Sequence, residues 1–178
     1  MKKYILIFFF LTTINTSISL SDTNIVFLDM DKIMLTSKAG SSILKQLDVL
    51  NKKALANFTS SEKKLKDAET KLIAQKNILA KTEYDKKVIA LRSEIKIYQD
   101  ERKKIILELN DLKLKSTNKL LQKVNQILIK FSEEKSISLI LQKKDIVTGK
   151  VELDISDDII KIVDLNIKEF KIKWQMNF

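Results

Sequence analysis

The sequence predicts an α+β fold, mainly α, in which a long antiparallel helical hairpin (a coiled-coil arm) projects from a small β body completed by oligomerisation. Three observations predict this class. Residues 44–131 carry core-type positions in alternating steps of three and four, which is the seam of a left-handed coiled coil. The 178 residues include no proline and two glycines, which suits long helices. Short β-like runs occur near the two ends, at 24–30 and after residue 135.

Residues 1–21 have the pattern of a secretory signal peptide. A positive start is followed by an apolar run at 4–13 that is too short to span a bilayer. The small residues Ser17, Ser19 and Ser21 then offer candidate cleavage sites. The alternative is an uncleaved anchor. We expect residues 22–178 to form a single exported domain, with residues 22–40 and 136–178 as its body and residues 41–135 as its arm.

The first body segment contains a strand. Ile25–Leu28 is an unbroken apolar run, as in a strand buried on both faces. Residues 31–36 favour a short helical turn, and residues 37–40 interrupt the pattern. Ser41 or Ser42 can then cap the first long helix, because a serine hydroxyl accepts a bond from a free amide of the first turn.

The first long helix is expected to run to about Lys81, with the tip of the hairpin near residues 80–84 and Thr82 as the next N-cap. The return helix should end near Lys135. The first seam comprises Leu44, Leu47, Asn51, Ala54, Phe58, Ser61, Leu65, Ala68, Leu72, Gln75 and Leu79. The second comprises Val88, Leu91, Ile95, Tyr98, Arg102, Ile105, Leu109 and Leu112, and after a shift of register Leu120, Val124, Ile127 and Phe131. Polar seam residues weaken the packing, so flexible arms are expected.

The C-terminal segment predicts two more short strands and a helix. Residues 136–142 alternate apolar and polar side chains, residues 146–149 form a second β-like piece, and a tight hairpin at 143–145 can join them. Ser156 is the expected N-cap of a helix whose apolar face is Ile159, Ile160, Ile162 and Val163. The remaining residues could prolong this helix or form a strand, and the alternation of Phe170, Ile172 and Trp174 favours the strand.

The predicted body is too small to hold a core alone, since a few short strands and one helix bury little apolar surface. Strands from several copies would therefore complete it. The residues expected in this oligomeric body are Ile25, Val26, Phe27, Leu28, Leu139, Ile140 and Leu141.

The composition excludes several chemistries. Without cysteine or histidine, the chain cannot by itself form a disulfide, a Cys/His zinc site or a Ser-His-Asp triad. The nearby pairs Asp29/Asp31 and Glu133/Glu134 are interpreted as caps and solvated charges. No catalytic residue, metal or cofactor is expected. The net charge of +10, of which two belong to residues 1–21, favours polyanions, anionic membranes or acidic partners.

The predicted tip of the hairpin is basic. It is rimmed by Lys76, Lys81, Lys86 and Lys87. Scattered lysines can simply solvate a helix end. The alternative is a docking patch for anionic membrane headgroups.

The two ends of the chain resemble those of the OmpH/Skp-type periplasmic chaperones of Gram-negative bacteria. The N-terminal resemblance lies in residues 25–33 (IVFLDMDKI) and 36–40 (TSKAG). The C-terminal resemblance lies in residues 139–141 (LIL) and 153–160 (LDISDDII). The order of signal peptide, strand, hairpin, strands and short helix also agrees. Two departures are the absence of glycine and an aromatic residue before residue 137, and a tail after Leu165 without a counterpart.

The resemblance implies a homotrimer whose arms enclose unfolded outer-membrane proteins in the periplasm and prevent their aggregation without ATP. The chain would hold clients and would not be an enzyme. The arm residues expected to face the client are Phe58, Leu65, Leu72, Leu79, Val88, Leu91, Ile95 and Tyr98. Lipopolysaccharide or an anionic membrane surface is a further possible partner.

Two other readings compete with the holdase. A coiled-coil adaptor of the periplasm could join two partners without binding unfolded chains. A basic helical protein could bind nucleic acid, but the export signal and the lack of interleaved arginine and aromatic residues on the arms argue against this. No nucleic-acid partner is therefore expected.

Overall fold

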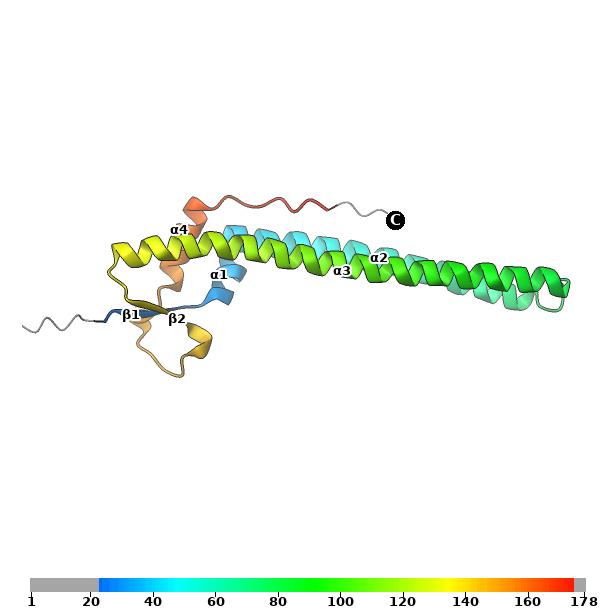
Figure 1. Ribbon diagram of the computed structural model, residues 1–178, viewed down its shortest axis with the longest axis horizontal. Coiled ribbons are helices and arrows are strands. Elements are labelled where there is room, and N and C mark those ends of the chain that lie inside the picture. The colour runs from blue at the N-terminus through cyan, green and yellow to red at the C-terminus, as the bar shows by residue number, and fades with distance from the viewer. Residues whose placement is uncertain (1–22, 175–178) are drawn as a thin grey trace, which may run out of the picture.

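Two long helices, α2 (Lys38–Ala74) and α3 (Lys81–Glu134), run antiparallel and form an arm that projects from a small body (Figure 1). This computed structural model describes residues 23–174, so the predicted signal peptide at 1–21 lies outside the described residues. At ~1.5 Å per residue, α3 is about 80 Å long. The predicted fold class, mainly α with a small sheet, is confirmed.

The body is built from both ends of the chain (Figure 1). Its elements are β1 (Ile25–Leu28), α1 (Met30–Thr36), β2 (Leu139–Gln142), the 3₁₀ turns η1 (Lys143–Asp145) and η2 (Val151–Leu153), and α4 (Ser156–Asn166). The two strands pair in parallel, with Ile25 opposite Leu139 and Leu28 opposite Gln142. Their connection is the whole arm, so the sheet fixes the base of the hairpin.

The predicted β-hairpin after β2 is wrong. Residues 143–145 form η1, closed by the Ile146 amide donating to the Lys143 carbonyl at 3.1 Å, and residues 146–149 form no strand. On the other side of β1, Phe27 instead forms an isolated parallel bridge with Asp154. The prediction of a turn at residues 143–145 is confirmed, and the prediction of a strand at residues 146–149 is wrong.

The first arm helix begins earlier than predicted, because Ser37 and not Ser41 or Ser42 is its N-cap. The Ser37 side chain is fully buried and its Oγ accepts from the Gly40 amide at 3.1 Å. Gly40 itself lies against α1: a Cβ there would stand 2.3 Å from the Met34 carbonyl oxygen. The Ser-x-Ala-Gly stretch therefore builds the tight corner between α1 and α2.

The tip also lies earlier than predicted. α2 ends at Ala74, a turn covers residues 75–80, and α3 begins at Lys81. The N-cap position is Ala80, without a side-chain cap, so the expected cap at Thr82 is wrong. Glu83 lies in the first turn of α3, where its negative charge suits the helix dipole.

Ser156, the predicted N-cap of α4, has a different role in the structure. Ser156 is the first helical residue, and its Oγ accepts from the Asp29 amide at 2.8 Å instead of capping α4. Asp154 satisfies the Ser156 amide through Oδ1 at 3.0 Å. The predicted apolar face is confirmed, since Ile159 and Val163 are fully buried and Ile160 and Ile162 pack against the same core.

A single chain buries more than the sequence suggested, because the base of the arm joins the body core. This core comprises Val26, Leu28, Ile33, Ala39, Ile43, Leu47, Leu120, Val124, Ile155, Ile159, Val163 and Ile167. A second cluster further along the arm comprises Ala54, Phe58, Ile105 and Leu109. The first seam starts at Ile43 and passes through Leu50, whereas the predicted Asn51 is exposed.

The tail after α4 is neither helix nor strand. Residues 167–174 run extended back along the arm (Figure 1). The alternation of Phe170, Ile172 and Trp174 therefore reflects one face against the arm and one face in solvent: these three are half-buried, and Lys171 and Lys173 between them are exposed.

Candidate functional site

The arm loses burial along its length. Near the body its seam residues are buried, as at Phe58, which is in the second cluster. Beyond Phe58, the predicted client-facing residues Leu65 and Leu72 on α2 and Leu79 in the turn at the tip are only half-buried. On α3, Val88, Leu91, Ile95 and Tyr98 are half-buried as well. Two helices alone cover only one side of each other, so part of this apolar seam faces solvent.

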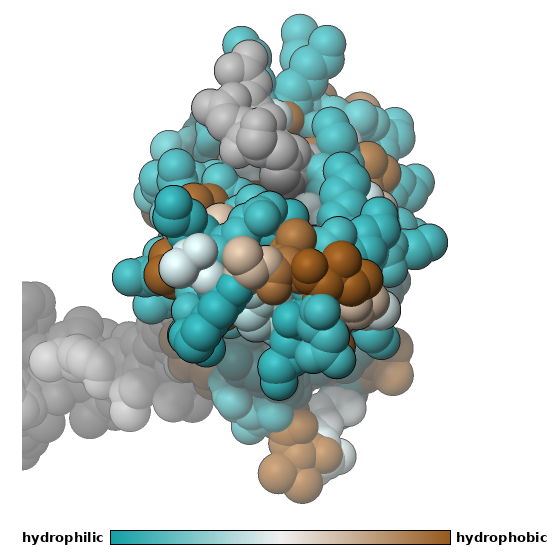
Figure 2. Space-filling view, turned by 90° about the vertical axis from the view of Figure 1, so that its right-hand side faces the viewer, coloured by the Kyte–Doolittle hydropathy of each residue, from teal (hydrophilic) through white to brown (hydrophobic). Residues whose placement is uncertain are grey.

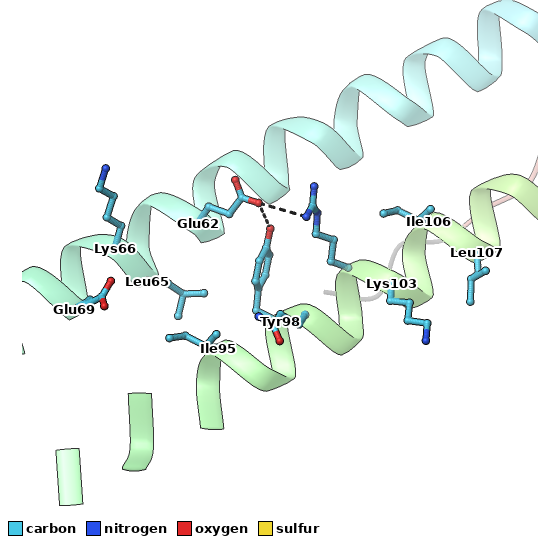
Figure 3. Close-up of a pocket in the computed structure, with 11 residues that line it drawn as sticks. Glu62, Leu65, Lys66, Glu69, Ile95, Tyr98, Lys103, Ile106 and Leu107 are labelled. Atoms are coloured by element: carbon cyan, nitrogen blue, oxygen red, sulfur yellow. Dashed lines mark hydrogen bonds and ion pairs between the residues drawn. The ribbon is translucent and has the colours of Figure 1, made fainter. Parts of the chain in front are cut away.

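An open groove of about 760 Å³ lies midway along the arm, between α2 and α3 (Figure 3). Leu65, Ile95 and Tyr98 line it, together with charged residues. The Tyr98 hydroxyl donates to Glu62 Oε1 at 2.6 Å, and Arg102 lies 3.9 Å from the same oxygen. These three polar groups cross-link the helices where the seam would otherwise be apolar.

Tyr98 stays neutral in this groove. Desolvation and the hydrogen bond to Glu62 raise its pKa to about 12. The predicted polar seam residue Arg102 is exposed, and its guanidinium lies 5.5 Å from the Phe58 ring centroid. The groove thus offers apolar side chains next to fixed hydrogen-bonding groups.

α3 carries a second apolar stripe that the sequence reasoning missed. Its members are each more than half exposed: Ile89, Ile97, Leu107, Leu114 and Ile129. At 3.6 residues per turn they fall within a sector of about 100°, on the side of α3 opposite the seam. Projecting the remaining apolar residues on a helical wheel would have revealed this stripe. Successive members are about two to four turns apart, with polar residues between them, so the stripe is a row of separate exposed apolar side chains on one face of α3.

Two of the four lysines predicted at the tip form ion pairs. Lys81 pairs with Asp85 at 2.8 Å, and Lys87 with Glu83 at 3.5 Å. The hydrogen bond to Asp85 raises the pKa of Lys81. In the described chain no carboxylate pairs with the remaining tip lysines, Lys76 and Lys86.

An exposed isoleucine accompanies these charges at the tip. Ile78 is 79% exposed in the turn, and Ile73 in the last turns of α2 is also largely exposed. Figure 2, which looks onto this end of the molecule, shows apolar surface bordered by hydrophilic side chains. The tip therefore combines a positive rim with an apolar centre.

The predicted oligomeric body divides into an inner and an outer set. Val26, Phe27 and Leu28 are buried within the chain itself. Ile25, Leu139 and Leu141 are 40%, 48% and 40% exposed, and Ile140 is half-buried. β1 is bonded on both sides, to β2 and to Asp154, whereas the outer edge of β2 has no strand partner in the described chain.

The described residues form neither a metal-binding cluster nor a membrane-spanning helix. No group of three or more acidic side chains within residues 23–174 is placed to hold a metal ion. In that same range, no helix is long and apolar enough to cross a membrane. What the described chain offers is apolar and charged surface.

The fold and these surfaces define a class of protein in which a two-helix arm with exposed apolar faces projects from a small α/β body. The chain belongs to the OmpH family: the family model described as outer membrane protein (OmpH-like) matches residues 24–163. This confirms the family suggested by the resemblance at both ends. The tail after residue 163, and with it the segment on the arm, lies outside the match.

A crystal structure from Caulobacter crescentus CB15, described as an OmpH-like outer membrane chaperone, has the same fold. Its TM-score is 0.78 at 16% sequence identity, covering 86% of this chain and 91% of that chain. At this identity the likeness speaks for the fold alone. No curated protein matches the chain.

Proposed function

We propose that this protein is an ATP-independent holdase chaperone of the periplasm that binds unfolded outer-membrane proteins on its arms and prevents their aggregation. The observation that carries the proposal is the arm itself, whose seam is half-open beyond Phe58 and whose α3 has a second exposed apolar stripe. An unfolded membrane-barrel strand exposes alternating apolar side chains and aggregates in water. Many weak contacts with such an arm would shield it.

Charge supports the same proposal. Without residues 1–21, which carry two of the ten net positive charges, the chain keeps a net charge of 10 − 2 = +8, and lysines are interspersed among the apolar residues along both arm helices. Net-acidic clients would be attracted, and since exposed charges are screened by salt, capture should weaken as salt rises. The sequence has two glycines and no glycine-rich phosphate loop, so client release would be downhill and would not depend on nucleotide. The family match and the signal-like residues 1–21 support export to the periplasm.

The test is an aggregation assay. An outer-membrane protein denatured in urea is diluted into buffer with and without the purified chain lacking residues 1–21, and light scattering is recorded. A holdase lowers the scattering in proportion to its concentration, without ATP. The rival proposal, a coiled-coil adaptor, predicts unchanged scattering, and that result would overturn the holdase.

We also propose that three copies assemble through the sheet. The open outer edge of β2 and the exposed Leu139 and Leu141 support this, because an unpaired edge with apolar neighbours favours pairing with another chain. Beside this edge, a groove of about 480 Å³ between β2 and α3 contains Leu128 and Ile129. Three arms rising from one body would enclose a client cavity.

The tip supports a smaller, separate proposal, docking on an anionic membrane surface. Ile78 could enter the headgroup region while Lys76 and Lys86 meet its negative charge. Sedimentation with vesicles of phosphatidylglycerol, compared with vesicles of phosphatidylcholine, tests it. Equal binding to both would remove the electrostatic part of the proposal.

A further inference from the structure

The tail on the arm occupies a shaped seat. After α4 the chain turns at the buried Ile167 and lies along the base of α2 and α3, within hydrogen-bonding distance of both helices. Figure 1 shows this extended segment following the axis of the arm. The seat is defined by Gln46, Lys119, Glu108 and the second cluster.

The side chain of Gln46 binds the main chain of the tail. Its Nε2 donates to the Phe170 carbonyl at 2.7 Å, and its Oε1 accepts from the Ile172 amide at 2.9 Å. The same Nε2 also bonds Ser42, at 3.2 Å to the carbonyl and 3.1 Å to Oγ, which fixes the orientation of the amide. One side-chain amide thus forms the two main-chain hydrogen bonds that a neighbouring strand would form, and these bonds do not depend on the side chains of the bound segment.

The apolar side chains of the tail enter separate places along the arm. Phe170 lies under Lys119, whose Nζ is 5.0 Å from the ring centroid. Phe170 and Ile172 pack against the body core. Trp174 packs against the second cluster, and its indole N–H donates to Glu108 Oε2 at 3.2 Å. The seat therefore fits an extended segment with an apolar residue at every second position.

The tail has the sequence pattern of the proposed clients. Alternation begins at Phe170, passes through Ile172 and Trp174, and continues in the sequence at Met176 and Phe178. Segments of about ten residues with this period are what strands of outer-membrane barrels look like. The segment also lies outside the family match at 24–163.

We propose that residues 168–174 fill, within the same chain, a binding seat for an unfolded segment with alternating apolar residues, and that such a client segment displaces them. The proposal rests on the proposed holdase function. It adds where a client segment binds and that the tail occupies this site in the absence of a client. The tail is suited to exchange, since its three apolar side chains are only half-buried. Because the tail is tethered, its effective concentration is in the millimolar range, so a free segment displaces it either at high concentration or when it also binds elsewhere on the arm.

Trp174 makes the exchange directly visible, because it is the only tryptophan of the chain. The purified chain lacking residues 1–21 is titrated with a Trp-free peptide of about ten residues in which leucine alternates with serine and lysine. We expect the Trp174 emission to shift to the red and its quenching by acrylamide to increase. A peptide of the same composition with its leucines in one run is the control. An unchanged emission at saturating peptide overturns the proposal.

Two variants sharpen the test. Gln46→Ala should release the tail and shift the emission without any peptide, whereas Gln122→Ala, on an exposed position of α3, should not. A chain ending at Ile167 should bind the labelled alternating peptide about tenfold more tightly than the full chain, since no tethered competitor remains. Equal affinity of the two chains would contradict the proposal.

The proposed holdase function and the proposed binding seat can be contradicted independently of each other. With a denatured outer-membrane protein whose tryptophans are replaced by phenylalanine, scattering and Trp174 emission are recorded together. Suppressed scattering with an unmoved Trp174 overturns the seat and leaves the holdase standing. Displacement of Trp174 by the peptide without suppressed scattering supports the seat and overturns the holdase.

Discussion

Gly40 is the residue on which the α1–α2 corner depends. A methyl group there would stand 2.3 Å from the Met34 carbonyl oxygen, a backbone atom held by α1. Gly40→Ala must therefore shift one helix, and we expect it to lower the free energy of unfolding by about 2 kcal/mol. Urea denaturation followed by circular dichroism measures this. In Gly149→Ala the nearest atom is 3.0 Å away on the Phe27 ring, a side chain that can shift, so an equal loss there would contradict the explanation.

Asp154 is the second residue that holds the body together. Burial alone would raise its pKa, but hydrogen bonds from Lys143 and Ser156 outweigh this and lower it to about 2. The Lys143 Nζ lies 2.6 Å from the carboxylate, and in the same junction the Ile155 amide donates to the Phe27 carbonyl at 3.0 Å. Asp154 thus fastens η1 and the start of α4 beside β1.

The stability that Asp154 contributes should depend on pH in a known direction. Its pKa is lower in the folded chain than the ordinary value near 3.8, so the contribution is present above pH 4 and is lost as the pH falls towards 2. We expect Asp154→Asn to cost about 2 kcal/mol at pH 7, and the difference from the unchanged chain to shrink to a small fraction of this near pH 2. Urea unfolding at a series of pH values measures both chains. A difference at pH 2 as large as that at pH 7 would mean that the charge is not the cause.

At the scale of elements, burial along the arm predicts its dynamics. Seam residues are buried at the base and half-buried from Leu65 outward, while the polar seam residue Ser61 lies at the boundary. Backbone amides beyond Phe58 should therefore exchange hydrogen faster than those near Leu47 and Leu120. Ser61→Leu should slow exchange in the outer arm by adding apolar contact across the seam. Uniform exchange along the arm would contradict the prediction of flexible arms.

The exposed stripe on α3 predicts which surface captures clients. Replacing Ile89, Ile97 and Leu107 together by serine should reduce suppression of scattering several-fold with little loss of stability, because these side chains are already more than half exposed. The matched control replaces the exposed Lys86, Lys96 and Lys103 on the same helix by serine. Since these lysines offer charge instead of apolar surface, that control should mainly weaken the salt dependence of capture. Full suppression of scattering by the triple variant at Ile89, Ile97 and Leu107 would exclude the stripe as the client-binding surface.

The sequence predicted the long elements well and the short ones poorly, for a physical reason. A helix of many turns repeats its pattern, so most seam positions from Ala54 to Phe131 could be assigned. A strand of four residues carries no information about its partner, and the parallel pairing of β1 with β2 brings together residues more than a hundred positions apart. The secondary structure of the tail was ambiguous because alternation of apolar residues indicates only that one face of an extended segment is buried. Here that face packs against the helical arm and not against a sheet.

At the scale of the whole molecule, the single chain has a complete core but an incomplete sheet. The buried clusters join the strands, α4 and the base of the arm within one copy. The outer edge of β2 keeps its apolar neighbours Leu139 and Leu141 in solvent. Such a chain can fold before it assembles, so the edge of β2 should control assembly more than it controls folding.

That separation leads to a prediction about mass. Leu139→Lys with Leu141→Lys should convert the proposed trimer to a monomer, because two charges would be desolvated at each interface while the core of the chain is left intact. Sedimentation equilibrium at micromolar concentration measures the mass, and circular dichroism verifies that the helices persist. The control is Leu165→Lys, a largely exposed leucine at the end of α4, away from the sheet. If the unchanged chain is itself monomeric at this concentration, the proposed assembly through the sheet is wrong, and a client would have to be held by one arm alone.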